Sequence, residues 1–283
     1  MTNGIFVGLS TIDVVYAVDH FPSPNKKVVA LSQDVHVGGP ATNASITFSH
    51  LGGAATLVTA VGRHPLANLV RQELERYSVR LIDLNPAFDD VPVISSISVN
   101  KAGERNIISA NATRVTALAA QLDEAAFKQA SVVLVDGHYM QVCQTWAGTA
   151  HARGIPVVFD GGSWKDGTEE LLKRVETAIC SADFLPPTCA TENDVLSYLK
   201  KCGVTNIAIT RGSESVRFVS NVASGVVQVP QVQVADTMGA GDIFHGAFCY
   251  YSSIGLGFVE ALQSATRIAA ESCRFRGTRE WMK

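Results

Sequence analysis

The sequence predicts an α/β domain with a mostly parallel central sheet, helices on both faces of that sheet and a small β-sheet lid. The first observation is the alternation of apolar strand-like runs with amphipathic helix-like runs, which is regular from residue 118 onward. Such alternation is typical of a parallel sheet covered on both faces by helices. The second is that two β-rich stretches, 14–37 and 91–110, interrupt the alternation. We therefore expect residues 1–283 to form one domain, with these two stretches inserted as the lid.

Composition is that of a globular protein with a substantial core. The chain has 283 residues, 47% of them hydrophobic and 17% charged, with a net charge of -3. It has no basic run, no apolar run that reaches a membrane span and no signal-peptide pattern at its start. Its six cysteines are scattered, without the spacing of a zinc site. We expect a cytoplasmic protein that binds neither nucleic acid nor membranes.

The first strand is expected at Ile5–Leu9, and Asp13 follows it. Open α/β sheets bind ligands at the carboxyl ends of their strands, so Asp13 is a candidate for binding hydroxyl groups. An aspartate that only caps a turn is an equal alternative. The other elements expected before residue 85 are β-like runs at Val14–Ala17 and Lys27–Leu31, a helix over residues 40–51, a strand at Thr56–Val61, a helix at Leu66–Tyr77 and a strand at Val79–Leu84.

A glycine pair, Gly38 and Gly39, precedes the first of these helices. Pro40 suits the first turn of a helix, and the helix is expected to stop at the second glycine pair, residues 52–53. Asn43 lies in the first helical turn and faces whatever the glycine turn encloses. By itself, this pattern is only moderately specific for a binding site.

The segments Val91–Val99 and Arg105–Ala110 flank a glycine-containing turn and predict a hairpin outside the main sheet. The regular alternation follows it. Its expected elements are helices at Leu118–Gln129, Cys143–Ala152, Thr168–Thr177, Glu192–Lys201, 240–254 and 257–273, strands at Val132–Val135, Pro156–Phe159, Ala182–Leu185 and Asn206–Thr210, and an antiparallel pair at Ser215–Val219 and Gly225–Val229.

The most informative stretch is Asp236-Thr237-Met238-Gly239-Ala240-Gly241-Asp242. It predicts a strand end, a glycine-flanked turn and the start of a helix. Small residues let the backbone approach a ligand closely, and the free N–H groups of a helix start attract anions. A carboxylate beside such a site suits a base that takes a proton from a hydroxyl attacking a phosphate. The stretch therefore indicates phosphoryl transfer, and the competing interpretation of Asp242 is a helix N-cap.

Asp13, the glycine-pair helix start at 38–43 and the turn at 236–242 together resemble the signatures of the ribokinase-like (PfkB) carbohydrate kinase family. The resemblance covers essentially the whole chain. It implies the ribokinase-like three-layer α/β/α fold and an ATP-dependent kinase that phosphorylates an alcohol group of a small sugar. The Gly103-Glu104-Arg105 turn and the Phe244-His245 continuation of the second signature favour the ketohexokinase and ketose-kinase branch. The family commonly pairs its lids, so a homodimer through the lid is expected.

The resemblance also implies roles for the residues of the two signatures. Asp242 is expected to be the catalytic base, and the backbone N–H groups of Gly239, Ala240 and Gly241 are expected to form an anion hole for the γ-phosphate. The residues expected to hold sugar hydroxyls are Asp13, Gly38, Gly39 and Asn43.

Two further residues are expected near the substrate. Arg105 on the hairpin is expected to reach a substrate or phosphate oxygen, with a solvated lid arginine as the alternative. His138 stands where some members of the family place a sugar-contacting acid, and a histidine satisfied by its own neighbours is the alternative.

The resemblance assigns ATP binding to the strand-end sequence Thr210-Arg211-Gly212-Ser213, together with Gly241. The last helix offers an apolar slot for the purine around Ala269, Ala270 and Cys273.

The family's usual Asn-x-x-Glu pair near the metal is absent. Thr188 and Thr191 stand in its place, and Glu192 comes one residue later. Mg²⁺ is therefore expected either through Glu192 by way of water or on the nucleotide and waters alone. A K⁺ ion near Asp236 and Thr237 is a further implication of the family.

Three other functions were weighed against a sugar kinase. A nucleoside kinase of the same fold would keep the chemistry, although the lid side chains Val93, Ile94 and Ile107 are aliphatic rather than aromatic. A non-catalytic sugar- or nucleotide-binding relative is favoured by the missing Asn-x-x-Glu pair and disfavoured by the intact turn at Asp242. A Rossmann oxidoreductase is disfavoured because no GxGxxG follows the first strand.

Overall fold

Buried apolar runs form the central sheet of the computed structural model, which describes residues 1–113, 117 and 122–283. Within those residues the sheet has nine strands, in the order β13-β12-β11-β10-β9-β8-β1-β4-β5. The strands from β11 to β5 run parallel, while β12 and β13 add an antiparallel edge. The bounds are β1 Asn3–Val7, β4 Ala54–Thr59, β5 Arg80–Asp83, β8 Val132–Val135, β9 Val157–Gly161, β10 Thr177–Ser181, β11 Asn206–Arg211, β12 Glu214–Val219 and β13 Ser224–Val227.

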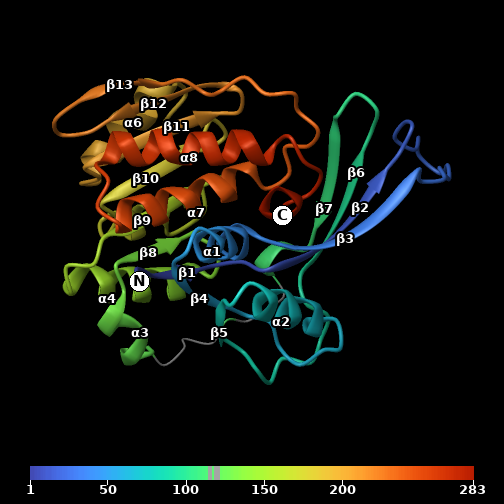
Figure 1. Cartoon of the computed structure of the whole chain (residues 1–283), viewed down its shortest axis with the longest axis horizontal. Coiled ribbons are helices and arrows are strands. Elements are labelled where there is room, and N and C mark those ends of the chain that lie inside the picture. The colour runs from blue at the N-terminus through green and yellow to red at the C-terminus, as the bar shows by residue number, and fades with distance from the viewer. Residues whose placement is uncertain (114–116, 118–121) are drawn as a thin grey trace.

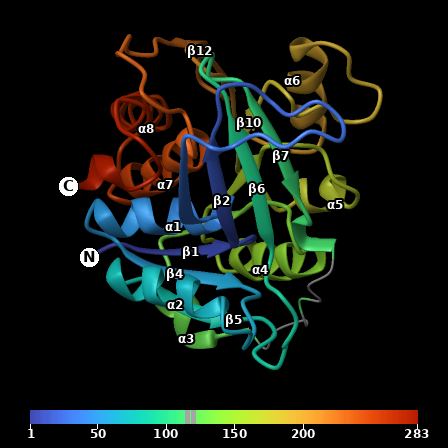
Figure 2. The ribbon, with the colours of Figure 1, turned by 90° about the vertical axis from the view of Figure 1, so that its right-hand side faces the viewer.

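Helices cover both faces of this sheet (Figure 2). One face carries α1 (Pro40–His50), α2 (Ala67–Arg76), α7 (Ala240–Ser253) and α8 (Phe258–Ser272), and the other α3 (Glu124–Gln129), α4 (Met140–Ala152), α5 (Thr168–Leu172) and α6 (Glu192–Lys201). Side chains of one strand alternate between the two faces: in β1, Phe6 packs under the first set, and Ile5 and Val7 pack under the second. The predicted three-layer α/β/α arrangement with a mostly parallel sheet is confirmed.

A second, four-stranded sheet projects from the body as an arm (Figure 1). Its order is β3-β2-β6-β7, with bounds β2 Thr11–Ala17, β3 Ser32–Gly38, β6 Ile94–Val99 and β7 Arg105–Ser109. The two central strands are parallel, and each edge strand is antiparallel to its neighbour. The hairpin at 91–110 is thus confirmed as an excursion from the main sheet, and we call this four-stranded sheet the lid. None of the helices in the described part of the chain has the length and apolarity needed to cross a bilayer.

The predicted strand at Lys27–Leu31 is wrong, because the lid strand comes immediately after it, at Ser32–Gly38. The first five residues of that strand include Ser32, Gln33 and Asp34 and are not buried. A lid strand with little buried surface needs no apolar alternation, so hydrophobicity did not mark it.

The prediction for residues 168–185 is also wrong in part. Helix α5 ends at Leu172, and the next strand is Thr177–Ser181 rather than Ala182–Leu185. Ala178, Ile179 and Cys180 are fully buried between the helical layers, as expected of a parallel strand. The short run at 182–185 is the turn that leaves this strand.

The predicted strand end before Asp236 and the predicted helix from residue 118 have different outcomes. The strand end expected before Asp236 is absent, because β13 ends at Val227 and residues 228–235 lie in no strand. The helix predicted from residue 118 lies partly outside the described residues, and its described part is α3, whose N-cap Asp123 accepts hydrogen bonds from the N–H groups of Ala125 and Ala126. The other predicted elements lie close to their expected bounds.

Candidate active site

The two sequence signatures meet where the amino termini of α1 and α7 lie side by side. Asn43 in α1 donates a hydrogen bond from Nδ2 to Oδ2 of Asp242 in α7, at 2.7 Å. Gly246 makes this approach possible, because a Cβ there would lie 2.3 Å from the carbonyl oxygen of Ala44. The chain thus brings together an amide and a carboxylate that are 199 residues apart in the sequence.

The carboxylate of Asp242 has an unusual proton affinity. Burial, and next the negative charge of Asp160, raise the pKa of Asp242 to about 7, while the hydrogen bond from Asn43 acts in the opposite direction. A general base works best when its pKa lies near the pH at which it operates. Asp242 therefore has the proton affinity that a base needs near neutral pH.

The turn before α7 presents backbone N–H groups beside this carboxylate. Gly239 adopts a left-handed conformation with φ 68°, and a Cβ there would lie 2.6 Å from Cγ2 of Thr278. The N–H groups of Gly239 and Gly241 have no hydrogen-bond partner within the described residues, whereas that of Ala240 donates to the carbonyl of Thr237 at 3.3 Å. Open N–H groups at a helix amino terminus attract anions. The turn therefore suits a phosphate next to Asp242.

Asp13 lies in the lid, not at the end of a central strand as the sequence indicated. Strand β1 ends at Val7, and the N–H of Leu9 donates to the carboxylate of Asp136 at 2.8 Å rather than continuing a strand. Asp13 is consequently the third residue of β2, level with His36 on β3 and Ser95 on β6. This places it at the end of the lid sheet nearest the body.

The glycine pair lies directly against Asp13. A Cβ on Gly38 would lie 2.0 Å from Oδ2 of Asp13. Gly39 has φ +97°, and a Cβ there would lie 2.3 Å from the carbonyl oxygen of Leu9. Burial raises the pKa of Asp13, and hydrogen bonds from Thr11 and Ser95 oppose this effect. Glycine is therefore required at position 39, where the backbone passes against Leu9, whereas a side chain at position 38 would displace the carboxylate of Asp13.

Three buried side chains under the site were not identified from the sequence. Asp136, 2% exposed, accepts hydrogen bonds from the N–H groups of Leu9 and His138, both at 2.8 Å, and so connects the ends of β1 and β8. Asp160 at the end of β9 lies 3.4 Å from Nδ1 of His245 on α7. Both acids follow or end buried strands, which is the signal that sequence reasoning applied to Asp13 and not to them.

His245 is held between the sheet and the turn that carries Asp242. Its Nδ1 lies 2.7 Å from the carbonyl oxygen of Gly241, and its Nε2 lies 3.1 Å from that of Ile179. Two carbonyl acceptors and the Asp160 carboxylate surround the ring. The pair formed by Asp160 and His245 therefore supports the first turn of α7 from below.

His138 follows β8 and lies in the same region. Burial lowers the pKa of its imidazole, and the charge of Asp136 has the opposite, smaller effect. The ring is therefore favoured in its neutral form. A contact between His138 and a sugar stays a prediction.

Arg105, the first residue of β7, reaches from the lid to the turn before α7. Its Nη2 donates to Oδ1 of Asp236 at 2.9 Å and to Oγ1 of Thr237 at 2.6 Å. The N–H groups of Met238 and Gly277 also donate to the Asp236 carboxylate, each at 2.9 Å. Arg105 thus joins the lid to the turn rather than lying free in solvent.

The residues expected to bind ATP lie at the end of β11. Gly212 has φ +61° and turns the chain after Arg211. The guanidinium of Arg211 lies 3.6 Å from the carboxylate of Glu192, which Arg217 also contacts at 2.8 Å. Residues Ala269, Ala270 and Cys273 lie at the carboxyl end of α8, where Ala270 is buried.

Comparison with known proteins identifies the family. A family model described as pfkB family carbohydrate kinase matches residues 1–283. The chain belongs to this family. The prediction of a carbohydrate kinase with the ribokinase-like fold is therefore confirmed, and the family implies ATP and a divalent metal.

Similar proteins show how widely the likeness extends. Ribokinase of Haemophilus influenzae is 20% identical over an alignment of 289 positions, which covers 96% of this chain and 92% of that protein. The crystal structure of a Thermotoga maritima ribokinase has a TM-score of 0.84 and 23% identity over 100% of this chain and 96% of its own. The Arabidopsis thaliana ribokinase structure, complexed with ribose and ATP, has a TM-score of 0.78 and 18% identity, and the match covers 100% of this chain and 98% of that chain. These relatives are ribokinases, so the ketose-kinase branch is unconfirmed.

Among the residues that the structure describes, the side chains of this pfkB kinase do not by themselves build a divalent metal site. No cluster of three or more His, Cys, Asp or Glu suited to a metal occurs in the part of the chain that the structure describes. The carboxylate of Glu192 is already paired with Arg217 and Arg211. This donor set fits a metal that is held by nucleotide phosphates and water.

The predicted monovalent-cation site at Asp236 and Thr237 does not fit a cation. A K⁺ ion needs oxygen atoms around it, whereas the groups that point at the Asp236 carboxylate are the N–H donors of Arg105, Met238 and Gly277. These N–H donors are a poor fit to a monovalent cation, and a K⁺ site at this turn stays a prediction.

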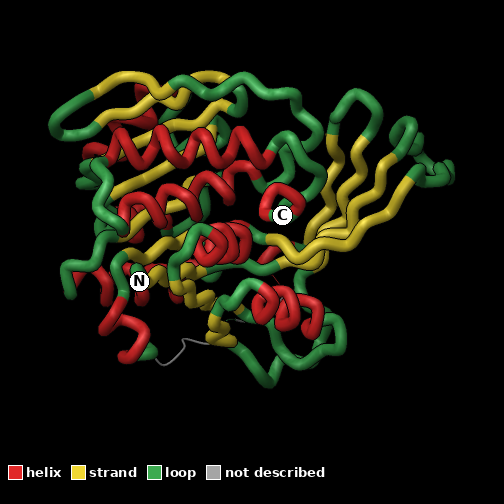
Figure 3. Tube along the Cα trace, in the orientation of Figure 1, coloured by secondary structure: helices red, strands yellow, loops and turns green. Residues whose placement is uncertain are grey.

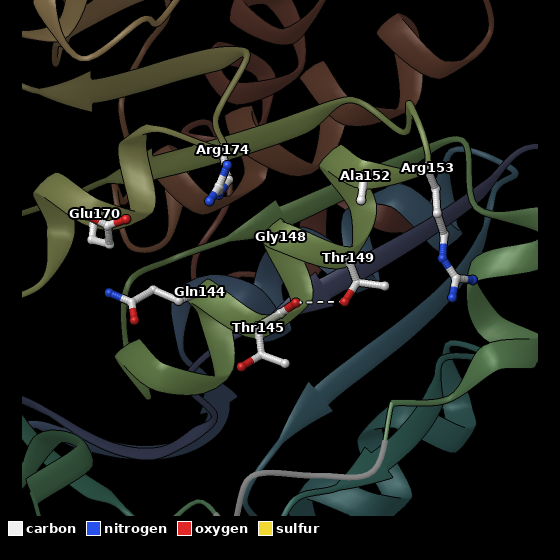
Figure 4. A pocket seen from close by; sticks show the side chains of 8 residues that line it. All are labelled: Gln144, Thr145, Gly148, Thr149, Ala152, Arg153, Glu170 and Arg174. Atoms are coloured by element: carbon white, nitrogen blue, oxygen red, sulfur yellow. Dashed lines mark hydrogen bonds between the residues drawn. The ribbon is translucent and has the colours of Figure 1, made fainter.

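A separate surface hollow of about 540 Å³ lies between α4 and α5 (Figure 4). It shares no residue with the predicted site. Its lining residues are Gln144, Thr145, Gly148, Thr149, Ala152, Arg153, Glu170 and Arg174.

Proposed function

We propose that this pfkB kinase transfers the γ-phosphate of ATP to a hydroxyl group of a small sugar, with Asp242 as the base. The observation that carries the proposal is the position of Asp242, whose carboxylate lies beside the open N–H groups of Gly239 and Gly241 and accepts a hydrogen bond from Asn43. A base next to an anion site is the arrangement that phosphorylation of a hydroxyl requires.

In this mechanism the lid and α1 bind the sugar. The carboxylate of Asp13 accepts hydrogen bonds from sugar hydroxyls, the backbone at Gly38 and Gly39 contacts the ring, and Asn43 orients the reacting hydroxyl toward Asp242. His138, whose N–H donates to the Asp136 carboxylate under the site, is a further candidate for a sugar contact. A carboxylate that accepts hydrogen bonds and an amide that can also donate them suit a substrate with several hydroxyl groups.

Asp242 takes the proton of the reacting sugar hydroxyl while the hydroxyl oxygen forms a bond to the γ-phosphorus of ATP. The bond between that phosphorus and the bridging oxygen breaks, and ADP leaves with the bridging oxygen. The backbone N–H groups of Gly239 and Gly241 stabilise the negative charge on the transferring phosphoryl group, together with the α7 dipole. The N–H of Ala240, the third predicted member of the anion hole, donates to the carbonyl of Thr237 in this structure. The loop at Thr210, Arg211, Gly212 and Ser213 binds the nucleotide, and a Mg²⁺ ion held by the nucleotide and water would supply positive charge to its phosphates.

The lid also supports the proposal of a homodimer. Val35, Ile107 and Ile108 are 52%, 59% and 77% exposed on its edge strands. Apolar edge strands are commonly covered by pairing with another chain. A solution mass equal to one 30.1 kDa chain at micromolar concentration would contradict the dimer.

The experiment is an ATP-consumption screen of the purified protein over aldopentoses, ketoses, sugar phosphates and nucleosides. We expect ADP formation that depends on one or a few sugars, and a ketose among them would support the narrower prediction. Selective use of nucleosides would favour the nucleoside-kinase alternative. Thermal stabilisation by ligands without any ligand-dependent ADP formation would instead indicate a binding protein and refute the proposal.

A further inference from the structure

The Asp236–Thr237 turn accepts hydrogen bonds from one side chain and from the backbone. Asp236 Oδ1 accepts from Arg105 and from the N–H of Met238, and Oδ2 accepts from the N–H of Gly277. Thr237 Oγ1 accepts from the same nitrogen of Arg105, at 2.6 Å. In the described part of the chain, the groups that contact this carboxylate are therefore N–H donors.

The positive charge at this turn comes from a side chain. An arginine stays protonated at all accessible pH values, and its planar guanidinium carries several donors in a fixed arrangement. The side chains of Arg105 and Asp236 are 27% and 24% exposed, so the pair is largely shielded from solvent. Hydrogen bonds between charged groups are stronger than neutral ones, more so where water is partly excluded.

The carbonyl groups near the turn are also engaged. The carbonyl oxygen of Cys273 accepts hydrogen bonds from the N–H groups of Ala235 and Asp236, and that of Thr237 accepts from the N–H of Ala240. A dehydrated monovalent cation would have to compete with a guanidinium and several N–H groups for these oxygens. The arrangement thus disagrees with the K⁺ site that the family resemblance implied.

We propose that the guanidinium of Arg105 takes the place of a monovalent cation at the Asp236–Thr237 turn, so that this kinase needs no potassium. The turn continues directly into Gly239–Gly241, so the charge of Arg105 fixes the conformation of the anion hole from one side. Because Arg105 belongs to β7, the lid supplies this cation and thereby supports the phosphate site.

The first test uses the wild-type protein and no catalysis. Binding of radioactive rubidium, a potassium substitute, is measured by equilibrium dialysis, and the melting temperature is compared in KCl, NaCl and choline chloride at equal ionic strength. We expect no rubidium binding above background and the same melting temperature in all three salts. Saturable rubidium binding, or stabilisation specific to KCl, would overturn the proposal.

The second test is kinetic and rests on the proposed function. Arg105→Met removes the charge and should lower kcat roughly 10- to 100-fold, the loss typical of one or two hydrogen bonds between charged groups. Arg105→Lys keeps a charge without the planar fork and should give an intermediate rate. The matched control is Lys101→Met on the same hairpin, since Lys101 pairs with Asp19 away from the turn and its loss should leave the rate unchanged.

Comparing the changes in kcat, in the KM for ATP and in the KM for the sugar separates this role of Arg105 from a merely structural one. We expect Arg105→Met to lower kcat and to raise the KM for ATP, while the KM for the sugar stays within about twofold of wild type. Wild-type rates in Arg105→Met without added K⁺ would contradict the proposal. If Arg105→Met fails to fold, Arg105→Lys and the wild-type rubidium measurement still decide. If the wild type consumes no ATP with any sugar, the proposed function fails while the binding test stays interpretable.

Discussion

Replacing Asp242 by asparagine should make the protein more stable while it removes the base. The folded protein raises the pKa of Asp242 from 3.8 to about 7, chiefly because the carboxylate is buried and lies near Asp160. The folded state therefore binds this proton more tightly than the unfolded state. The cost of ionising Asp242 consequently grows as the pH rises from 3.8 to about 7 and stays constant above that.

The size of the effect follows from the two pKa values. At about 1.4 kcal/mol per pH unit, the interval between 3.8 and about 7 corresponds to at most roughly 4 kcal/mol. Asparagine is neutral at every pH and can still accept the hydrogen bond from Asn43. We expect Asp242→Asn to be more stable than wild type by about 2–4 kcal/mol at pH 8, and by less than half of that difference at pH 5.

Urea unfolding of both proteins at pH 8 and pH 5 measures this difference without any knowledge of the substrate. The matched control is Asp90→Asn, because Asp90 is exposed and the substitution should change stability little at either pH. An Asp242→Asn protein less stable than wild type at pH 8, or a gain that does not change with pH, would refute the assignment of a buried carboxylate with a raised pKa.

Three further predictions concern the neighbours of Asp242. Asp160→Asn removes the charge that helps to raise the pKa of Asp242, so the acid limb of the pH profile of kcat/KM should move to lower pH, and an unmoved limb would contradict the coupling. Asn43→Ala removes the hydrogen bond that lowers the pKa of Asp242, so the acid limb of the kcat/KM profile should move to higher pH. A shift of the acid limb to lower pH, as expected for Asp160→Asn, would show that the hydrogen bond has another role. Gly39→Ala should destabilise the protein by roughly 1–3 kcal/mol, because φ is +97° and the new Cβ would meet the carbonyl of Leu9. Gly148→Ala in α4, where the space around the new Cβ is open, should not destabilise the protein. Equal melting temperatures of the two variants would contradict the close approach at Gly39.

The sequence predicted the central layers well because their physical pattern is local. Buried parallel strands such as Val132–Val135 are continuous apolar runs, and helices such as Glu192–Lys201 have an amphipathic period with a capping box at Thr191. The lid strand Ser32–Gly38 was missed because it buries little surface and needs no such pattern. The predicted helix at Thr168–Thr177 ran into the start of β10 and left Ala178, Ile179 and Cys180 in no element, because short apolar runs do not distinguish a buried strand from a buried helix.

The candidate site was predicted where a motif carried it. Asp242, its glycine turn and Asn43 come together as the two signatures indicated. The buried pair of Asp160 and His245 was not found. Asp160 ends a buried strand, a local pattern, but its contact with His245 depends on the packing of α7 against the sheet. The role of Arg105 also needed the structure, because only the pairing of β6 with β7 directs its side chain to Asp236.

The most direct test of the central account is the rate of sugar phosphorylation by wild type and by Asp242→Asn, measured at pH 8 with a sugar that the wild type uses. If Asp242 is the base, the variant should lose roughly 10²- to 10⁴-fold in kcat, with little change in the KM for the sugar. A variant that keeps its rate within about threefold of wild type would contradict the account.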